Sequence, residues 1–180
     1  MNEPFITIKE LADHVEELIA LVGMDIYYSY KKEGYHDQKI LDGSFLQNVK
    51  GERKCEGMYK DGEKHGMWSY YVNNPYHPMA RDYFDNGLRI KNEVLHNDGH
   101  HIRMVSTYDD KEHPVKQVTY GDDGKTIIKL DIFQQGLIKE ENIVVPDGQQ
   151  QVIYKYDDKF KLVEKRHFLN GDLVKVEAIS

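Results

Sequence analysis

The residues that most resemble metal ligands lie at positions 96–101, which read His-Asn-Asp-Gly-His-His. Three imidazoles and a carboxylate at one turn could bind zinc or a similar ion. However, His100 and His101 are adjacent, so on a strand their side chains would point to opposite sides, and only one could converge with His96. We therefore interpret the stretch as a solvated hairpin turn and expect no metal and no cofactor. A metal-dependent hydrolase using these histidines is the less favoured alternative.

Covalent catalysis has one candidate nucleophile, Cys55, which is the single cysteine of the chain. No motif around it marks a reactive thiol, and it falls in an expected half-buried strand, so we interpret it as a small core residue. A lone cysteine also excludes an internal disulfide and a cysteine-rich zinc site. The sequence contains no glycine-rich phosphate loop, no HExxH helix and no GxSxG elbow. We therefore predict no catalytic residues and no enzyme activity.

Protein binding is the remaining chemistry for which the sequence offers candidates. The densest aromatic group consists of Trp68, Tyr70, Tyr71 and Tyr76. On a strand, Trp68 and Tyr70 would share one face and Tyr71 would take the other. Tryptophan and tyrosine are enriched among the residues that dominate interface energetics, so these four are the predicted partner-binding residues. Packing in the core is the alternative interpretation, especially for Trp68.

The composition limits the partners. The chain has 180 residues and a net charge of -7, with an isoelectric point near 5.7. This acidity argues against nucleic acid and anionic membranes as partners, since both attract an excess of Lys and Arg. A surface matched to a basic partner, or one that mimics nucleic acid, is a second interpretation. There is no signal peptide pattern and no apolar run of membrane-spanning length, so we expect a cytoplasmic protein.

Residues 1–23 are predicted to form an amphipathic helix. Thr7 followed by Glu10 makes a capping box, Ile6 and Leu11 are spaced as a hydrophobic staple, and Gly23 would end the helix. The apolar stripe of this helix would consist of Ile8, Leu11, Val15, Leu18, Ile19 and Val22. The stripe would pack on, or cap, a sheet formed by the rest of the chain, and contact with a partner helix or a second copy of the chain is the alternative.

The rest of the chain is predicted to be β-structure. Residues 24–51 suggest irregular first strands, and residues 51–180 carry turn signals every 10–14 residues, from Asp61-Gly62 to Asn170-Gly171. This spacing predicts one continuous domain of antiparallel hairpins of about 24 residues each. The glycines expected to shape its turns are Gly57, Gly62, Gly66, Gly87, Gly99, Gly124, Gly136, Gly148 and Gly171.

Residues 55–71 resemble a MORN repeat. The matching positions are Gly57, Tyr59, Gly62, Gly66 and Trp68. The tryptophan and the period are similar to the bacterial MORN-variant repeats that are grouped as antitoxin components of toxin–antitoxin systems. Later repeats lack the second glycine. The resemblance implies an elongated, twisted antiparallel sheet and a role in protein interaction rather than catalysis.

The functional prediction is therefore a non-catalytic module that uses one sheet face to bind a partner protein, and that could inhibit or neutralise it. The repeats, the acidity and the lack of catalytic motifs support this interpretation. The alternative is a structural or self-assembling protein, because the open edges of a sheet pair readily with other strands. A homo-oligomer is compatible with either.

Overall fold

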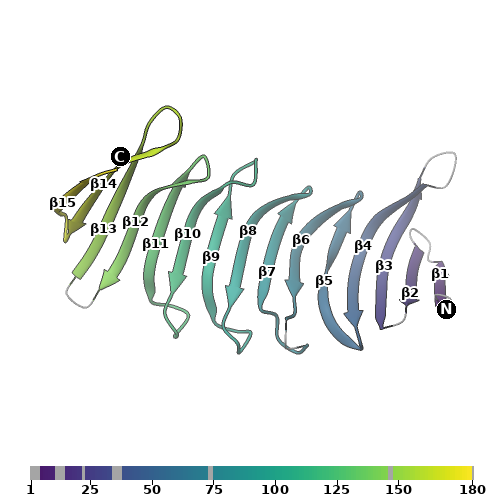
Figure 1. The fold of residues 1–180 in the computed structure, drawn as a ribbon. Helices are drawn as coiled ribbons and strands as arrows, with labels where there is room; N and C mark the ends of the chain where they lie inside the picture. Colours follow the sequence, from purple (N-terminus) through teal and green to yellow (C-terminus); the bar gives the residue numbers. More distant parts are fainter. Residues whose placement is uncertain are drawn as a thin grey trace. The chain divides into compact units, whose positions relative to one another are not determined.

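The computed structural model describes residues 5–10, 15–21, 23–33, 38–72, 75–145 and 148–179 (Figure 1). Within these ranges the secondary structure is entirely β, and no helix could span a membrane. The prediction of a mainly β protein is confirmed. The chain divides into two compact units, Met1–His100 and His101–Ser180.

The described residues of unit 1 form eight strands, and each pairs antiparallel with the next along the chain. They are β1 (Phe5–Glu10), β2 (Val15–Leu21), β3 (Met24–Glu33), β4 (Gln38–Val49), β5 (Glu52–Lys60), β6 (Glu63–Tyr70), β7 (Ala80–Asp85) and β8 (Leu88–Leu95). The strands follow one another in chain order, as hairpin-by-hairpin folding predicts (Figure 1).

Unit 2 contains seven strands with the same sequential antiparallel pairing. They are β9 (Ile102–Tyr108), β10 (Pro114–Tyr120), β11 (Ile127–Gln134), β12 (Leu137–Val145), β13 (Gly148–Tyr156), β14 (Leu162–Leu169) and β15 (Asp172–Ala178). The sequences of these strands alternate between polar and apolar residues, which suits a sheet because successive side chains point to opposite faces. In β11, for example, Lys129 and Asp131 point to one side while Leu130 and Ile132 point to the other.

The predicted N-terminal helix is wrong. Its first part is β1 and its second part is β2, and the two strands pair from Phe5 opposite Ala20 to Glu10 opposite Val15. The physical reason is that β2 also pairs with β3, so its backbone hydrogen bonds are satisfied between strands rather than within a helix. Glu17, expected on the wet side of the helix, is buried opposite Tyr28 and accepts a hydrogen bond from Lys39 Nζ at 2.6 Å. Two members of the expected stripe, Leu11 and Val22, lie outside the described residues.

Tight turns join many of the strands. Among the described residues, five two-residue turns have positive φ at both positions, which is the type I′ geometry that matches strand twist. They are Lys50-Gly51, Asp61-Gly62, Asn86-Gly87, Gln135-Gly136 and Asn170-Gly171. Longer loops in unit 2 are instead stabilised by an aspartate carboxylate that accepts hydrogen bonds from backbone N–H groups of the same loop. Asp123, for example, accepts hydrogen bonds from the backbone N–H groups of Lys125 and Thr126, at 2.9 and 2.8 Å.

Gly57 differs from the other glycines expected to shape turns. It lies inside β5 without a positive φ, and the indole of Trp68 covers it. A Cβ atom at this position would lie 2.3 Å from Cδ2 of Trp68. Gly57 is therefore needed because the ring packs directly on the backbone, and not because the chain turns there.

We predict that Gly57→Ala lowers the free energy of unfolding by about 1–3 kcal/mol, because the indole must leave its position. Urea denaturation followed by the fluorescence of Trp68, the single tryptophan, measures this directly. Gly121→Ala is the control, because a Cβ there meets its nearest atoms at an ordinary 3.7 Å. Equal stability of the two variants would contradict the packing argument.

Candidate functional site

The strand register places the predicted binding residues on two different faces of unit 1. Trp68 pairs with Asp82 and lies on the same side as Phe45 and Phe84, which we call the tryptophan face. The opposite side carries Met67, opposite Tyr83, and Met58, opposite Ser44. We call this side the methionine face. Its methionine side chains are much more exposed to solvent than Trp68.

The tryptophan face is closed over its aromatic side chains. Trp68 is 1% exposed, with ring centroids of Phe45, Tyr59 and Phe84 at 5.3, 5.0 and 6.5 Å. Its indole N–H donates to the backbone carbonyl of Met58 at 3.0 Å. The ammonium of Lys64 lies 4.3 Å from the centre of the ring, in cation–π geometry. Trp68 is therefore fully engaged within the chain and has no surface left for a partner.

The two neighbouring tyrosines are also engaged internally. Tyr70 is half-buried, and burial together with Asp82 raises its pKa above the ordinary value. Tyr71 is 6% exposed, its hydroxyl donates to Oε1 of Glu56 at 2.5 Å, and the guanidinium of Arg53 lies 5.5 Å from its ring centre. Tyr76 alone among the four predicted binding residues is highly exposed, at 85%.

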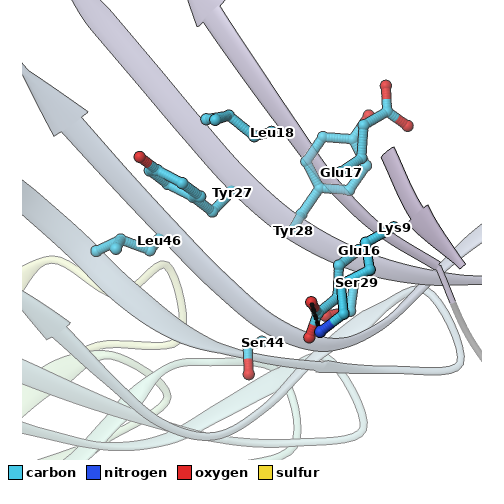
Figure 2. A pocket seen from close by; sticks show the side chains of 9 residues that line it. All are labelled: Lys9, Glu16, Glu17, Leu18, Tyr27, Tyr28, Ser29, Ser44 and Leu46. Atoms are coloured by element: carbon cyan, nitrogen blue, oxygen red, sulfur yellow. Dashed lines mark ion pairs between the residues drawn. The ribbon is translucent and has the colours of Figure 1, made fainter. Parts of the chain in front are cut away.

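The methionine face carries a groove across the first strands. Its apolar floor consists of Leu18 on β2, Tyr27 on β3 and Leu46 on β4, which follow one another across the sheet (Figure 2). An ion pair between Lys9 and Glu16, 3.6 Å apart, lies at its border. The groove has a volume of about 410 Å³, which is within the range of sites that hold side chains or small ligands.

A second hollow of about 410 Å³ shares Leu46 with this groove. It is lined further by Asn48, Gly51, Arg53, Pro75 and Tyr76. On the same face, Met58 and Met67 are 54% and 49% exposed, and Tyr27, which lines the groove, is 40% exposed. The methionine face therefore combines two adjoining hollows with exposed apolar side chains.

Sequence reasoning missed Tyr27, Leu46, Met58 and Met67. The alternation of side chains along each strand could have indicated them. Because Trp68 is buried, its neighbour Met67 has to face the other way, and the same holds for Tyr27 beside Tyr28. The prediction followed residue type, and three of the four aromatic residues that it chose are buried or half-buried.

The histidine stretch forms a loop after β8. The backbone N–H of His100 donates to Oδ1 of Asp98 at 2.8 Å, and the ring of His100 meets that of His77 edge-on at 5.1 Å. Among the described residues there is no group of three or more His, Cys, Asp or Glu side chains that could hold a metal ion. Burial raises the pKa of the Cys55 thiol, which favours the unreactive protonated form at neutral pH.

Comparisons with known proteins add little. A family described as a protein of unknown function (DUF2963) matches residues 95–131, which is too short a part of the chain to assign membership. No curated protein matches. One similar solved structure is a mutant of S. aureus TarM in complex with fondaparinux, alpha-GlcNAc-glycerol and UDP. The similarity covers 77% of this chain but 21% of that one, at 13% identity and a TM-score of 0.33, and it carries no argument.

Unit 2 contains a buried carboxylate cluster. Asp131 on β11 has a side chain that is 5% exposed, and it shares the ammonium of Lys129 with Glu141, at 3.1 and 3.2 Å. The hydroxyl of Tyr154 donates to Glu141 at 3.5 Å. Burial raises the pKa of Asp131, even though Lys129 opposes the shift. Burial favours the protonated form of the Asp131 carboxyl group, so holding it ionised at neutral pH lowers the stability of the folded state.

We predict that Asp131→Asn removes a contribution to the free energy of unfolding that falls as pH rises above about 4, the ordinary pKa of an aspartate, so the slope of stability against pH becomes more positive there. Because the pKa of Asp131 is raised in the folded state, that state binds a proton more readily than the unfolded chain, so this group's contribution falls as pH rises. At neutral pH the variant should be as stable as the wild type or more stable by up to about 1 kcal/mol, since Lys129 keeps Glu141.

Asp123→Asn is the control for this measurement. Hydrogen bonds from Thr126 and from backbone N–H groups lower the pKa of Asp123 to about 2, so its contribution is lost only as pH falls through that value. Denaturant titrations at a series of pH values would compare the two. An unchanged pH slope in Asp131→Asn would show that the carboxylate is not held in an unfavourable site.

Proposed function

We propose that this chain is a non-catalytic protein-binding module whose partner binds to the methionine face of unit 1. The observation that carries the proposal is the contrast between the two faces. On one face Trp68 is 1% exposed beneath its neighbours, while on the other Met58 and Met67 are about half exposed and two adjoining hollows lie over β2, β3, β4 and β5. A protein gains nothing in stability by leaving such side chains in water, so a surface of this kind favours a binding role.

The chemistry of the face also supports a protein partner. Methionine side chains are flexible and polarisable, which lets them adapt to the surface that covers them. Tyr27 and Tyr76 add rings with a polar end, and Arg53 lines the second hollow together with Tyr76. Tyrosine, methionine and arginine are the residues that protein interfaces enrich relative to other surfaces. An inhibitory or neutralising role, as the MORN-variant resemblance implies, is part of the same proposal.

We predict that a photo-crosslinking amino acid at Tyr27, Met58 or Met67 captures one and the same protein in cells that naturally express this chain. Matched positions in unit 2, Val115 and Val144, are 37% and 55% exposed and should not capture it. Mass spectrometry identifies the captured protein, which is then purified for direct binding measurements.

With the purified partner, Tyr27→Ala and Met58→Ala should each weaken binding by about 1–2 kcal/mol, or roughly five- to thirtyfold in Kd. Ile128→Ala in unit 2, where the wild-type side chain is 41% exposed, should leave Kd unchanged. Capture from the unit 2 positions alone, or equal Kd values for all three variants, would overturn the assignment of the binding face.

A further inference from the structure

The loop between β13 and β14 in unit 2 holds an aromatic residue in an unfavourable backbone conformation. Phe160 has a φ of 61°, in the left-handed region that bulky residues rarely adopt. It is also 59% exposed. Phe160 therefore lowers the stability of the folded chain in two ways, through its strained backbone and through an apolar ring left in water.

A second loop of unit 2 has the same hydrogen bonds and shows that this backbone does not require a phenylalanine. In the loop between β9 and β10, the carboxylate of Asp109 accepts hydrogen bonds from the backbone N–H groups two and four residues further on, at 2.9 and 2.8 Å. Asp157 accepts the same two bonds in the loop that contains Phe160, both at 2.9 Å. The residue that corresponds to Phe160 in the first loop is Glu112, with a φ of 59°. The loop thus accommodates a polar residue at this place, and the aromatic ring has another use.

Phe160 lines a hollow over β11, β12 and β13, and the lining also includes Tyr154 and Tyr156. The hydroxyl of Tyr156 donates to the backbone carbonyl of Ile138 at 2.9 Å, and the hydroxyl of Tyr154 donates to Glu141 at 3.5 Å. These bonds fix both tyrosines, so two aromatic walls are in place before a ligand arrives. The hollow has a volume of about 290 Å³, at the lower end of the range for small-ligand sites.

The charge at this hollow is not balanced. Lys139 lines it, and within the described part of the chain its ammonium group has no ion pair. Glu141 lies two residues further along the same strand, on the same face, but it binds Lys129 at 3.2 Å. The carboxylate of Asp157, which also lines the hollow, accepts the backbone hydrogen bonds of its own loop. An anionic group is therefore the complement that the hollow lacks.

We propose that this hollow binds a small aromatic anion, meaning one aromatic ring that carries a carboxylate or a phosphate. The ring would pack against Tyr154, Tyr156 and Phe160 in offset or edge-on contacts, and the anionic group would pair with Lys139. Binding would remove the ring of Phe160 from water, which explains a residue that is unfavourable in the free chain. The inference goes beyond the proposed function and does not depend on it, since it concerns unit 2 alone.

Titration of the isotope-labelled full chain with phenyl phosphate, followed by NMR chemical shifts, provides the first test. We expect a Kd of about 1–10 mM, as is usual for a fragment of about ten heavy atoms. The amide signals that shift should be those of Lys139, Phe160 and residues 154–157. Benzoate should shift the same signals, and the relative affinities of the two probes identify the preferred anionic group. Inorganic phosphate and benzyl alcohol each supply half of the ligand and should bind about fivefold more weakly or worse.

Two variants separate binding from structure. Lys139→Gln should weaken phenyl phosphate about fivefold and leave benzyl alcohol unchanged, because only the charge is removed. Phe160→Gly should also weaken phenyl phosphate about fivefold. Its unfolding midpoint in urea should nevertheless equal or exceed that of the wild type, because glycine adopts a positive φ without strain. Glu112→Gly is the matched control, since it makes the same backbone change in the other loop and should bind phenyl phosphate like the wild type.

Four results would overturn the proposal. The first is the absence of localised shifts at phenyl phosphate concentrations roughly tenfold above the expected Kd. The second is binding of inorganic phosphate or benzyl alcohol as tight as that of phenyl phosphate. The third is unchanged affinity in Lys139→Gln or Phe160→Gly. The fourth is a lower unfolding midpoint in Phe160→Gly, which would show that the ring serves the fold.

Discussion

The contact between the Trp68 indole and the backbone of Gly57 is the constraint on which unit 1 depends. A Cβ atom at position 57 would lie only 2.3 Å from the nearest atom of the indole ring. The ring can approach the backbone this closely because glycine has no side chain. Once seated, the ring brings Phe45, Tyr59 and Phe84 within stacking distance and draws Lys64 over its face. The aromatic side chains around Trp68 are thereby packed against one another, while Met58 and Met67 on the opposite face are left about half exposed.

Long polar side chains supply much of the remaining cover. The ammonium of Lys39 binds the buried Glu17 and lies 4.6 Å from the ring centre of Tyr30. The arrangement recurs at Lys91, which binds Glu93 at 2.7 Å and lies 4.3 Å from the ring of Tyr83. In each case the aliphatic stem covers apolar surface while the charge is paired. A chain with 31% charged residues can therefore fold as a sheet whose described strands are covered by their own side chains rather than by helices.

The sequence predicted the features that are encoded locally. Asx-Gly and related pairs require positive φ, and the pairs Asp61-Gly62, Asn86-Gly87 and Asn170-Gly171 have it because no distant contact is needed to produce such a turn. The N-terminal segment is different. Residues such as Ile8, Val15 and Leu18 suit one stripe of a helix or the faces of two strands, and the presence of β3 beside β2 decided between them. The exposure of Met58 and Met67 was missed for a related reason, because alternation fixes only the face on which they lie, and their exposure depends on the side chains that neighbouring strands place beside them, Ser44 and Tyr83.

A repeated hairpin leaves two kinds of unsatisfied surface, and they differ in chemistry. A face offers side chains, so its affinity comes from buried apolar area and its specificity from shape, as at Tyr27 and Leu46. An edge offers backbone N–H and C=O groups, which any strand could match, so its specificity has to come from the side chains opposite one another. Along the described ladder these backbone groups are matched by the neighbouring strand in the sequence, so the surface that differs from one hairpin to the next is the face and its side chains.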